Sequence, residues 1–150
     1  IALFESQASA RANRVENDAM YAELPPAAFE ANYLSRHGHL PRIVRGLSQG
    51  IVDVATSGSH RFVHIDASHL YDNVRGDILA AKTLLQPDGL VVFDDIRGQH
   101  THGVAAAVWQ AVAVHVLEVI ALSEPKLEAC WADGAKCRQS ARQLIQPATP

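Results

Sequence analysis

The stretch FVHIDASHLYDNVRGDILAAKTLLQPDGLVVFDDI, residues 62–96, decides the fold. Its first five residues, 62–66, contain β-branched side chains and predict a strand. The middle of the stretch predicts a helix, because apolar residues recur at helical spacing at Val74, Ile78, Ala81 and Leu85. A Pro-Asp-Gly turn at 87–89 precedes a continuous apolar strand at 90–93, which is typical of a central parallel strand covered by helices on both sides. The stretch therefore predicts a strand–helix–strand unit of an α/β sheet.

The segments on either side extend this alternation of helices and strands. Helices are predicted at residues 6–24, 27–36, 48–54, 101–115 and 137–146. Further strands are predicted at 42–45, 117–122 and 127–131, the last two as a hairpin. We expect one domain over residues 1–150, with a helical N-terminal segment (1–40), an α/β core (41–132) and a tail (133–150). Its fold class is α/β, with a Rossmann-like, mostly parallel sheet, flanking helices and a C-terminal antiparallel hairpin.

Composition and charge exclude several classes of protein. The 150 residues are 48% hydrophobic and 19% charged, which is typical of a globular domain. The net charge of −3 argues against a nucleic-acid partner. No apolar run reaches the roughly 18 residues of a transmembrane helix, so we expect no membrane partner. We interpret Cys130 and Cys137 as ordinary thiols in a reducing compartment, and therefore expect a cytoplasmic protein.

Acidic residues follow two strands of the predicted sheet. Asp66 ends one strand, and Asp94 and Asp95 end the next. Strands joined by one crossover helix are usually neighbours, so these carboxylates should meet at the edge of the sheet where ligands bind. Clustered carboxylates repel one another unless a cation lies between them. The pattern therefore predicts a site for Mg²⁺, a hard cation that prefers oxygen ligands.

His69 lies three residues after Asp66, on the loop that leads into the next helix. A neutral imidazole can take a proton from a hydroxyl near pH 7. A hydroxyl bound to a divalent cation is more acidic than a free one, so a metal and His69 would cooperate. His69 is therefore the candidate general base.

Each of these residues also has a structural interpretation. An Asp at a strand end often serves as a turn or helix-capping residue. We interpret His64, inside the strand, as a packed core residue. His100 and His102 could line a substrate pocket or simply lie in solvated loops.

Residues 62–96 resemble the class I S-adenosylmethionine-dependent methyltransferases. Within that fold they are similar to the group with an IDGSH-Y strand end, an LL-PGG turn and a DD pair. This group includes metal-dependent O-methyltransferases of macrolide sugars and, more distantly, catechol O-methyltransferases. A weaker resemblance extends over residues 42–131, where HTHGVAAAVW, residues 100–109, matches a segment that usually begins H-T-P-G-V.

The resemblance implies roles for individual residues of the acidic edge. Asp66, Asp94 and Asp95 fall at the positions of the group's magnesium ligands. His69 falls at the position of its general base. The resemblance also implies S-adenosylmethionine as cofactor beside Mg²⁺.

Four residues match positions that contact the cofactor in this family. Gly46 and Ser48 resemble the loop after the third strand, where a small polar residue touches the adenine. Glu5 resembles the strand-end acid that accepts hydrogen bonds from the ribose hydroxyls. Asp66 is the fourth candidate.

The sequence departs from the family at its N-terminal side. The first strand and its glycine-rich loop have no counterpart, since Gly38 is the one glycine before residue 42. The chain therefore resembles an N-terminally truncated methyltransferase with an exposed sheet edge. An open edge carries unpaired N–H and C=O groups, so we expect a homo-oligomer that covers it.

These observations favour a methyltransferase, if the chain is an active enzyme. It would transfer a methyl group from S-adenosylmethionine to a hydroxyl of a sugar or small polyol, with the assistance of a metal. The alternative is a non-catalytic methyltransferase-like remnant that acts through protein–protein contacts or as an oligomer. A metal-dependent hydrolase using the same acids is a third possibility, although nothing marks a phosphate site.

Overall fold

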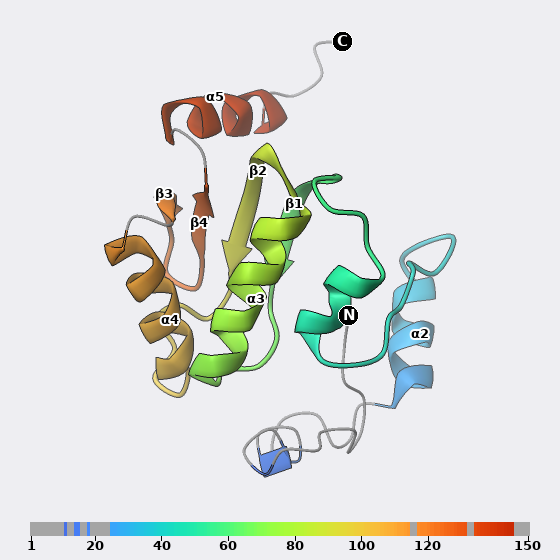
Figure 1. Cartoon of the computed structure of the whole chain (residues 1–150). Helices are drawn as coiled ribbons and strands as arrows, with labels where there is room; N and C mark the ends of the chain where they lie inside the picture. The colour runs from blue at the N-terminus through green and yellow to red at the C-terminus, as the bar shows by residue number, and fades with distance from the viewer. Residues whose placement is uncertain are drawn as a thin grey trace. The chain divides into compact units, whose positions relative to one another are not determined.

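Figure 1 shows the computed structural model of the chain. The structure describes residues 11, 14, 15, 18, 25–114, 117–131 and 134–145. The chain divides into two compact units, residues 1–53 and 54–150. Most of the predicted helix at 6–24 lies outside the described residues. The expectation of a single domain over the whole chain stays a prediction.

Between residues 25 and 53, the first unit contains one α-helix and one 3-10 helix. Helix α2, Pro26–Leu34, confirms the helix predicted at 27–36, and a proline begins it because the first turn needs no N–H from that residue. The helix predicted at 48–54 is the 3-10 helix η1, Ser48–Asp53. The strand predicted at 42–45 is wrong, since within this described segment Arg45 makes a single bridge and the residues before it have no regular structure. A proline, which lacks an N–H, precedes this run and Gly46 at φ 147° follows it, so neither neighbour favours continuing a ladder.

The second unit is a sheet with helices on both of its faces (Figure 1). Its strands are β1 (His60–Ile65), β2 (Leu85–Phe93), β3 (Glu118–Leu122) and β4 (Leu127–Cys130). Its helices are α3 (Tyr71–Leu84), α4 (His102–Ala113) and α5 (Gly134–Ile145). Among the described residues, no helix combines the length and the apolar character that crossing a bilayer requires.

The described sheet has the order β1-β2-β4-β3. Strands β1 and β2 are parallel and joined through α3, as the sequence predicts. Strands β3 and β4 form the predicted antiparallel hairpin, and β4 pairs antiparallel with β2. The α/β Rossmann-like class is confirmed. The described sheet is mixed rather than mostly parallel, because the hairpin contributes two of its three pairings.

The alternation of side chains along β2 divides the core into two layers. Val91 and Phe93 pack with α3 and α4 on one face of the sheet. Leu90 points to the other face and packs with Cys130 and Cys137. Apolar residues on both faces explain why 90–93 reads as a continuous run rather than an alternation.

The turn predicted at 87–89 lies inside β2 as an irregularity of the ladder. Along this part of the pair, His60 lies opposite Leu85 and Phe62 lies opposite Leu90, so four residues of β2 face one residue of β1. A Cβ at Gly89 would lie 3.2 Å from the carbonyl oxygen of His60 and 2.7 Å from the side chain of Leu85. Glycine therefore allows the backbone to pass closely here.

The two cysteines form a disulfide between the end of β4 and the beginning of α5. The interpretation of Cys130 and Cys137 as ordinary thiols is therefore wrong. The pairing joins two buried residues seven positions apart that pack in the same layer of the core. The disulfide also removes the reason for which we expected a reducing compartment.

We expect reduction of this disulfide to destabilise the second unit. A crosslink that closes so short a loop restricts the unfolded chain and contributes roughly 2–3 kcal/mol. Urea unfolding of the protein with and without dithiothreitol measures this difference. A thiol titration of the native protein should find no free thiol, and equal unfolding midpoints in the two conditions would contradict the expectation.

Candidate active site

The parallel pairing of β1 and β2 brings two of the predicted acids together. Ile65 lies opposite Phe93 at the ends of the two strands, and the N–H of Asp94 donates to the carbonyl oxygen of Ile65 at 3.0 Å. Asp66 and Asp94 are therefore neighbours at the carboxyl edge of the sheet. This is the position where ligands bind in open α/β sheets.

A histidine joins these acids from within β1. His64 lies two residues before Asp66, so the two side chains leave the same face of the strand. Its Nε2 lies 3.4 Å from Oδ2 of Asp94. His64, Asp66 and Asp94 each offer a ligand atom, and these atoms all lie within 4.8 Å of one another. The interpretation of His64 as a packed core residue is wrong, because its side chain is exposed on the face that carries Asp66.

Lys126 completes the environment of Asp94. Its Nζ donates to Oδ2 of Asp94 and lies 3.3 Å from Nε2 of His64. The Lys126 ammonium, more than any other group, holds the pKa of Asp94 below its usual range, although burial opposes the shift. The Lys126 contact therefore stabilises the charged form of Asp94. Sequence reasoning did not find Lys126, because a single lysine in a hairpin turn carries no local signal for a contact 32 residues away.

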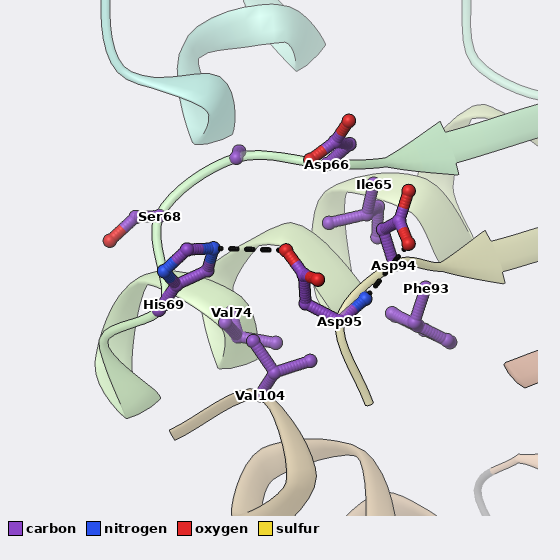
Figure 2. Close-up of a pocket in the computed structure, with 10 residues that line it drawn as sticks. Ile65, Asp66, Ser68, His69, Val74, Phe93, Asp94, Asp95 and Val104 are labelled. Atoms are coloured by element: carbon purple, nitrogen blue, oxygen red, sulfur yellow. Dashed lines mark hydrogen bonds and ion pairs between the residues drawn. The ribbon is translucent and has the colours of Figure 1, made fainter. Parts of the chain in front are cut away.

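Asp95 turns away from this group and faces His69. Its Oδ2 lies 3.4 Å from Nε2 of His69, whose side chain is 11% exposed. Figure 2 shows the Asp95 carboxylate pointing toward the His69 ring, while Asp66 and Asp94 lie at the ends of neighbouring strands. All four residues line one pocket. The structure thus brings the predicted residues together as two pairs, Asp66 with Asp94 and Asp95 with His69.

The backbone of Asp95 is held in an unusual conformation. Its φ is 56°, which a residue other than glycine adopts at an energetic cost. The N–H of Asp95 donates to Oδ1 of Asp94 at 2.9 Å, and the buried hydroxyl of Thr101 donates to the carbonyl oxygen of Asp95 at 2.6 Å. These contacts fix the direction in which the Asp95 carboxylate points.

The loop that carries His69 is fixed on two sides. Ser68 accepts hydrogen bonds from the backbone N–H of Leu70 at 3.2 Å and from the side chain of Asn73 at 2.8 Å. Gly103, in the first turn of α4, lies so close to this loop that an added Cβ would be 2.2 Å from the carbonyl oxygen of His69. The ring of His100 also meets the His69 ring edge-on, with centroids 5.5 Å apart. The His69 ring is therefore held by packing as well as by Asp95.

We expect Gly103→Ala to displace the His69 loop. The new methyl group would collide with the backbone of that loop, and overpacking of this kind costs about 1–3 kcal/mol. Thermal unfolding measures the loss, and the His69 ring resonances in an NMR spectrum should shift. Gly38→Ala serves as the control, because open space surrounds that position. An unchanged His69 spectrum in Gly103→Ala would contradict the expectation.

The structure does not test the remaining predicted cofactor contacts. Glu5 falls outside the described residues. Gly46 and Ser48 belong to the first compact unit, where Ser48 begins η1. Their roles toward S-adenosylmethionine stay predictions.

The sequence profile of a methyltransferase-domain family matches residues 4–96. The match covers more than half of the chain and includes His69 and all three acids of the site. The chain belongs to this methyltransferase-domain family. The resemblance to class I S-adenosylmethionine-dependent methyltransferases is thereby confirmed. No curated protein matches the sequence.

Two solved structures have the same fold as this methyltransferase-family chain. The O-methyltransferase NovP aligns over 88% of this chain and 57% of its own length, with 13% identity and a TM-score of 0.61. A protein of Corynebacterium glutamicum aligns over 71% of this chain and 56% of its own, with 15% identity and a TM-score of 0.54. The chain thus spans little more than half the length of these relatives, and the likeness establishes the fold alone.

The donor set at the acidic edge fits a hard divalent cation. Asp66 and Asp94 supply carboxylate oxygens, the ligands that Mg²⁺ prefers, and His64 adds a nitrogen. The Lys126 ammonium bound to Asp94 indicates that this edge attracts a positive charge. Asp95 faces His69 in this arrangement, and its predicted role as a metal ligand stays a prediction.

Proposed function

We propose that this chain catalyses methyl transfer from S-adenosylmethionine to a hydroxyl oxygen of a sugar or small polyol, with assistance from Mg²⁺. The observation that carries the proposal is the pocket of a methyltransferase-family chain in which Asp66 and Asp94 lie side by side next to the His69–Asp95 pair. Two carboxylates and an imidazole at one strand edge supply both a cation site and a base.

Asp66 and Asp94 would hold the metal, with His64 beside them. A bound Mg²⁺ supplies positive charge that makes a neighbouring hydroxyl easier to deprotonate, and S-adenosylmethionine supplies the methyl group. Vicinal hydroxyls chelate a divalent cation well, which favours a sugar or polyol as the acceptor. Asp66 stands at the carboxyl end of β1, where family resemblance also gives it a contact to the cofactor.

His69 acts as the general base in this proposal. Its imidazole would accept the proton of the acceptor hydroxyl as the oxygen bonds to the methyl carbon, the methyl–sulfur bond breaks and S-adenosylhomocysteine leaves. The Asp95 carboxylate beside Nε2 orients the ring and stabilises the positive charge that forms on it. The low exposure of His69 keeps bulk water away from the proton transfer.

The proposal also includes a homo-oligomeric assembly and a cytoplasmic location. A homo-oligomer would cover the β1 edge of the sheet that the described residues form, where β2 pairs on the other side of β1. A cytoplasmic location stays a prediction, and the Cys130–Cys137 disulfide counts against it because disulfides persist in oxidising compartments.

The second candidate is a non-catalytic remnant that acts through protein contacts. It is favoured by the two protein partners that already occupy the acids, Lys126 on Asp94 and His69 on Asp95. Such pairing would leave the fold intact without any ligand.

Calorimetric titrations of the whole chain with S-adenosylmethionine and with Mg²⁺ distinguish these functions. Binding of both, with micromolar affinity for the cofactor, supports the methyltransferase. Binding of neither supports the remnant and overturns the proposal. Metal binding without cofactor binding would instead favour metal chemistry of another kind, such as hydrolysis.

A further inference from the structure

Lys126 reaches the acidic edge from the turn between β3 and β4. Its ammonium contacts Asp94 and lies 3.3 Å from Nε2 of His64. These are two of the three residues whose ligand atoms converge at this edge. The ammonium therefore occupies the side of the group on which a divalent cation would contact the same two residues.

We propose that Lys126 is a resident counter-ion that competes with a divalent cation for Asp94 and His64. It thereby sets the affinity of the metal site, so the inference rests on the proposed function. With Lys126 in place, the edge is neutralised without a metal. When a cation binds, the ammonium leaves.

Electrostatics makes the two positive groups mutually exclusive. An ammonium and a divalent cation at hydrogen-bonding distance from one carboxylate would repel each other strongly in a partly buried site. The Asp94 side chain is only 17% exposed, so solvent screens this repulsion incompletely. Binding of the cation must therefore displace Lys126 from Asp94.

The lysine side chain can make that movement. It is 38% exposed, and its flexible four-carbon stem allows the ammonium to move into solvent. The turn that carries it is held separately by backbone contacts. The N–H of Ser123 donates to the carbonyl oxygen of Lys126 at 2.9 Å, and the N–H of Lys126 donates to the Ser123 hydroxyl oxygen at 3.3 Å. Loss of the Lys126 side chain should therefore leave the hairpin closed.

Titration with Mn²⁺ and Mg²⁺, followed by calorimetry, tests the competition directly. We expect Lys126→Met to bind the cation about tenfold more tightly than the unmodified protein, which corresponds to about 1.4 kcal/mol. Lys126→Arg keeps the positive charge and should stay close to the original affinity. Lys82→Met is the matched control, because it removes the same charge from the exposed last turn of α3. Thermal unfolding with and without Mn²⁺ gives a second readout that does not depend on activity.

Each outcome has a definite meaning. Tighter binding in Lys126→Met, with Lys82→Met unchanged, supports the competition. Equal or weaker binding in Lys126→Met overturns it and leaves the metal site of the proposed function standing. An equal gain in both variants overturns it as well, because a change in net charge would then explain the effect. If no form of the protein binds either cation, both this inference and the metal assistance fail, and titration with S-adenosylmethionine still tests the methyltransferase itself.

Discussion

Replacing His69 by alanine is expected to lower methyl transfer by about 10²–10⁴-fold, the usual contribution of a general base. The imidazole lies in the pocket that Asp66, Asp94 and Asp95 also line, and its Nε2 faces Asp95 at 3.4 Å. Alanine removes the proton acceptor without altering the strand-end acids. The affinities for S-adenosylmethionine and for Mg²⁺ should therefore stay almost unchanged. Single-turnover rates and calorimetric titrations of the same preparation separate the chemical step from binding.

The control for this substitution is His39→Ala. His39 is an exposed residue of the first unit, and its loss should leave turnover unchanged. If His69→Ala turns over as fast as the unmodified protein, His69 is not the base. If it loses cofactor affinity to the same degree as turnover, its role is in binding rather than in proton transfer.

The core of the second unit could be predicted because its signals are local. The helical spacing of apolar residues predicts α3, and the continuous run at 90–93 predicts a strand with two buried faces. The order of these elements then fixes a parallel pair with its carboxyl ends at one edge. The proximity of Asp66 and Asp94 follows from that topology.

What the sequence could not predict depends on contacts between distant segments. The disulfide requires the position of α5 relative to β4, which two cysteines seven residues apart do not specify. Lys126 reaches Asp94 because β4 pairs with β2, a pairing that neither segment encodes by itself. His64 is a different case, because the period of two along β1 already places it on the same face as Asp66. Because His64 lies between the apolar residues Val63 and Ile65, the sequence analysis assigned it to the core instead.

The carboxylates of Asp94 and Asp95 contact different partners although the two residues are adjacent in the sequence. Consecutive residues of an extended chain point to opposite sides, so the two carboxylates of a DD pair tend to point apart. Here Asp94 leaves β2 toward Lys126 and His64, and Asp95, at φ 56°, faces His69. Adjacent acids with the same charge therefore acquire different partners.

Because Asp94 and Asp95 have different partners, we expect their substitutions to affect metal binding differently. Asp94→Asn should weaken Mn²⁺ binding by more than about 100-fold. Removing a residue that only supports a ligand lowers metal affinity by about 10–100-fold, and removing the ligand itself should lower it more. Asp95→Asn should change the affinity less, because its carboxylate faces His69, and should act mainly on turnover. Calorimetry with Mn²⁺ and single-turnover rates for the two variants measure both effects.

Asp88→Asn is the matched control, since it removes the same charge from an exposed position of β2 and should change neither quantity. Equal losses of affinity in Asp94→Asn and Asp95→Asn would show that Asp95 is a ligand as well, as the family resemblance implies, and that it turns from His69 to the metal on binding. Unchanged affinity in Asp94→Asn would remove Asp94 from the metal site. In that case the Lys126–Asp94 pair would be structural, because a carboxylate that holds no cation needs only its ammonium partner.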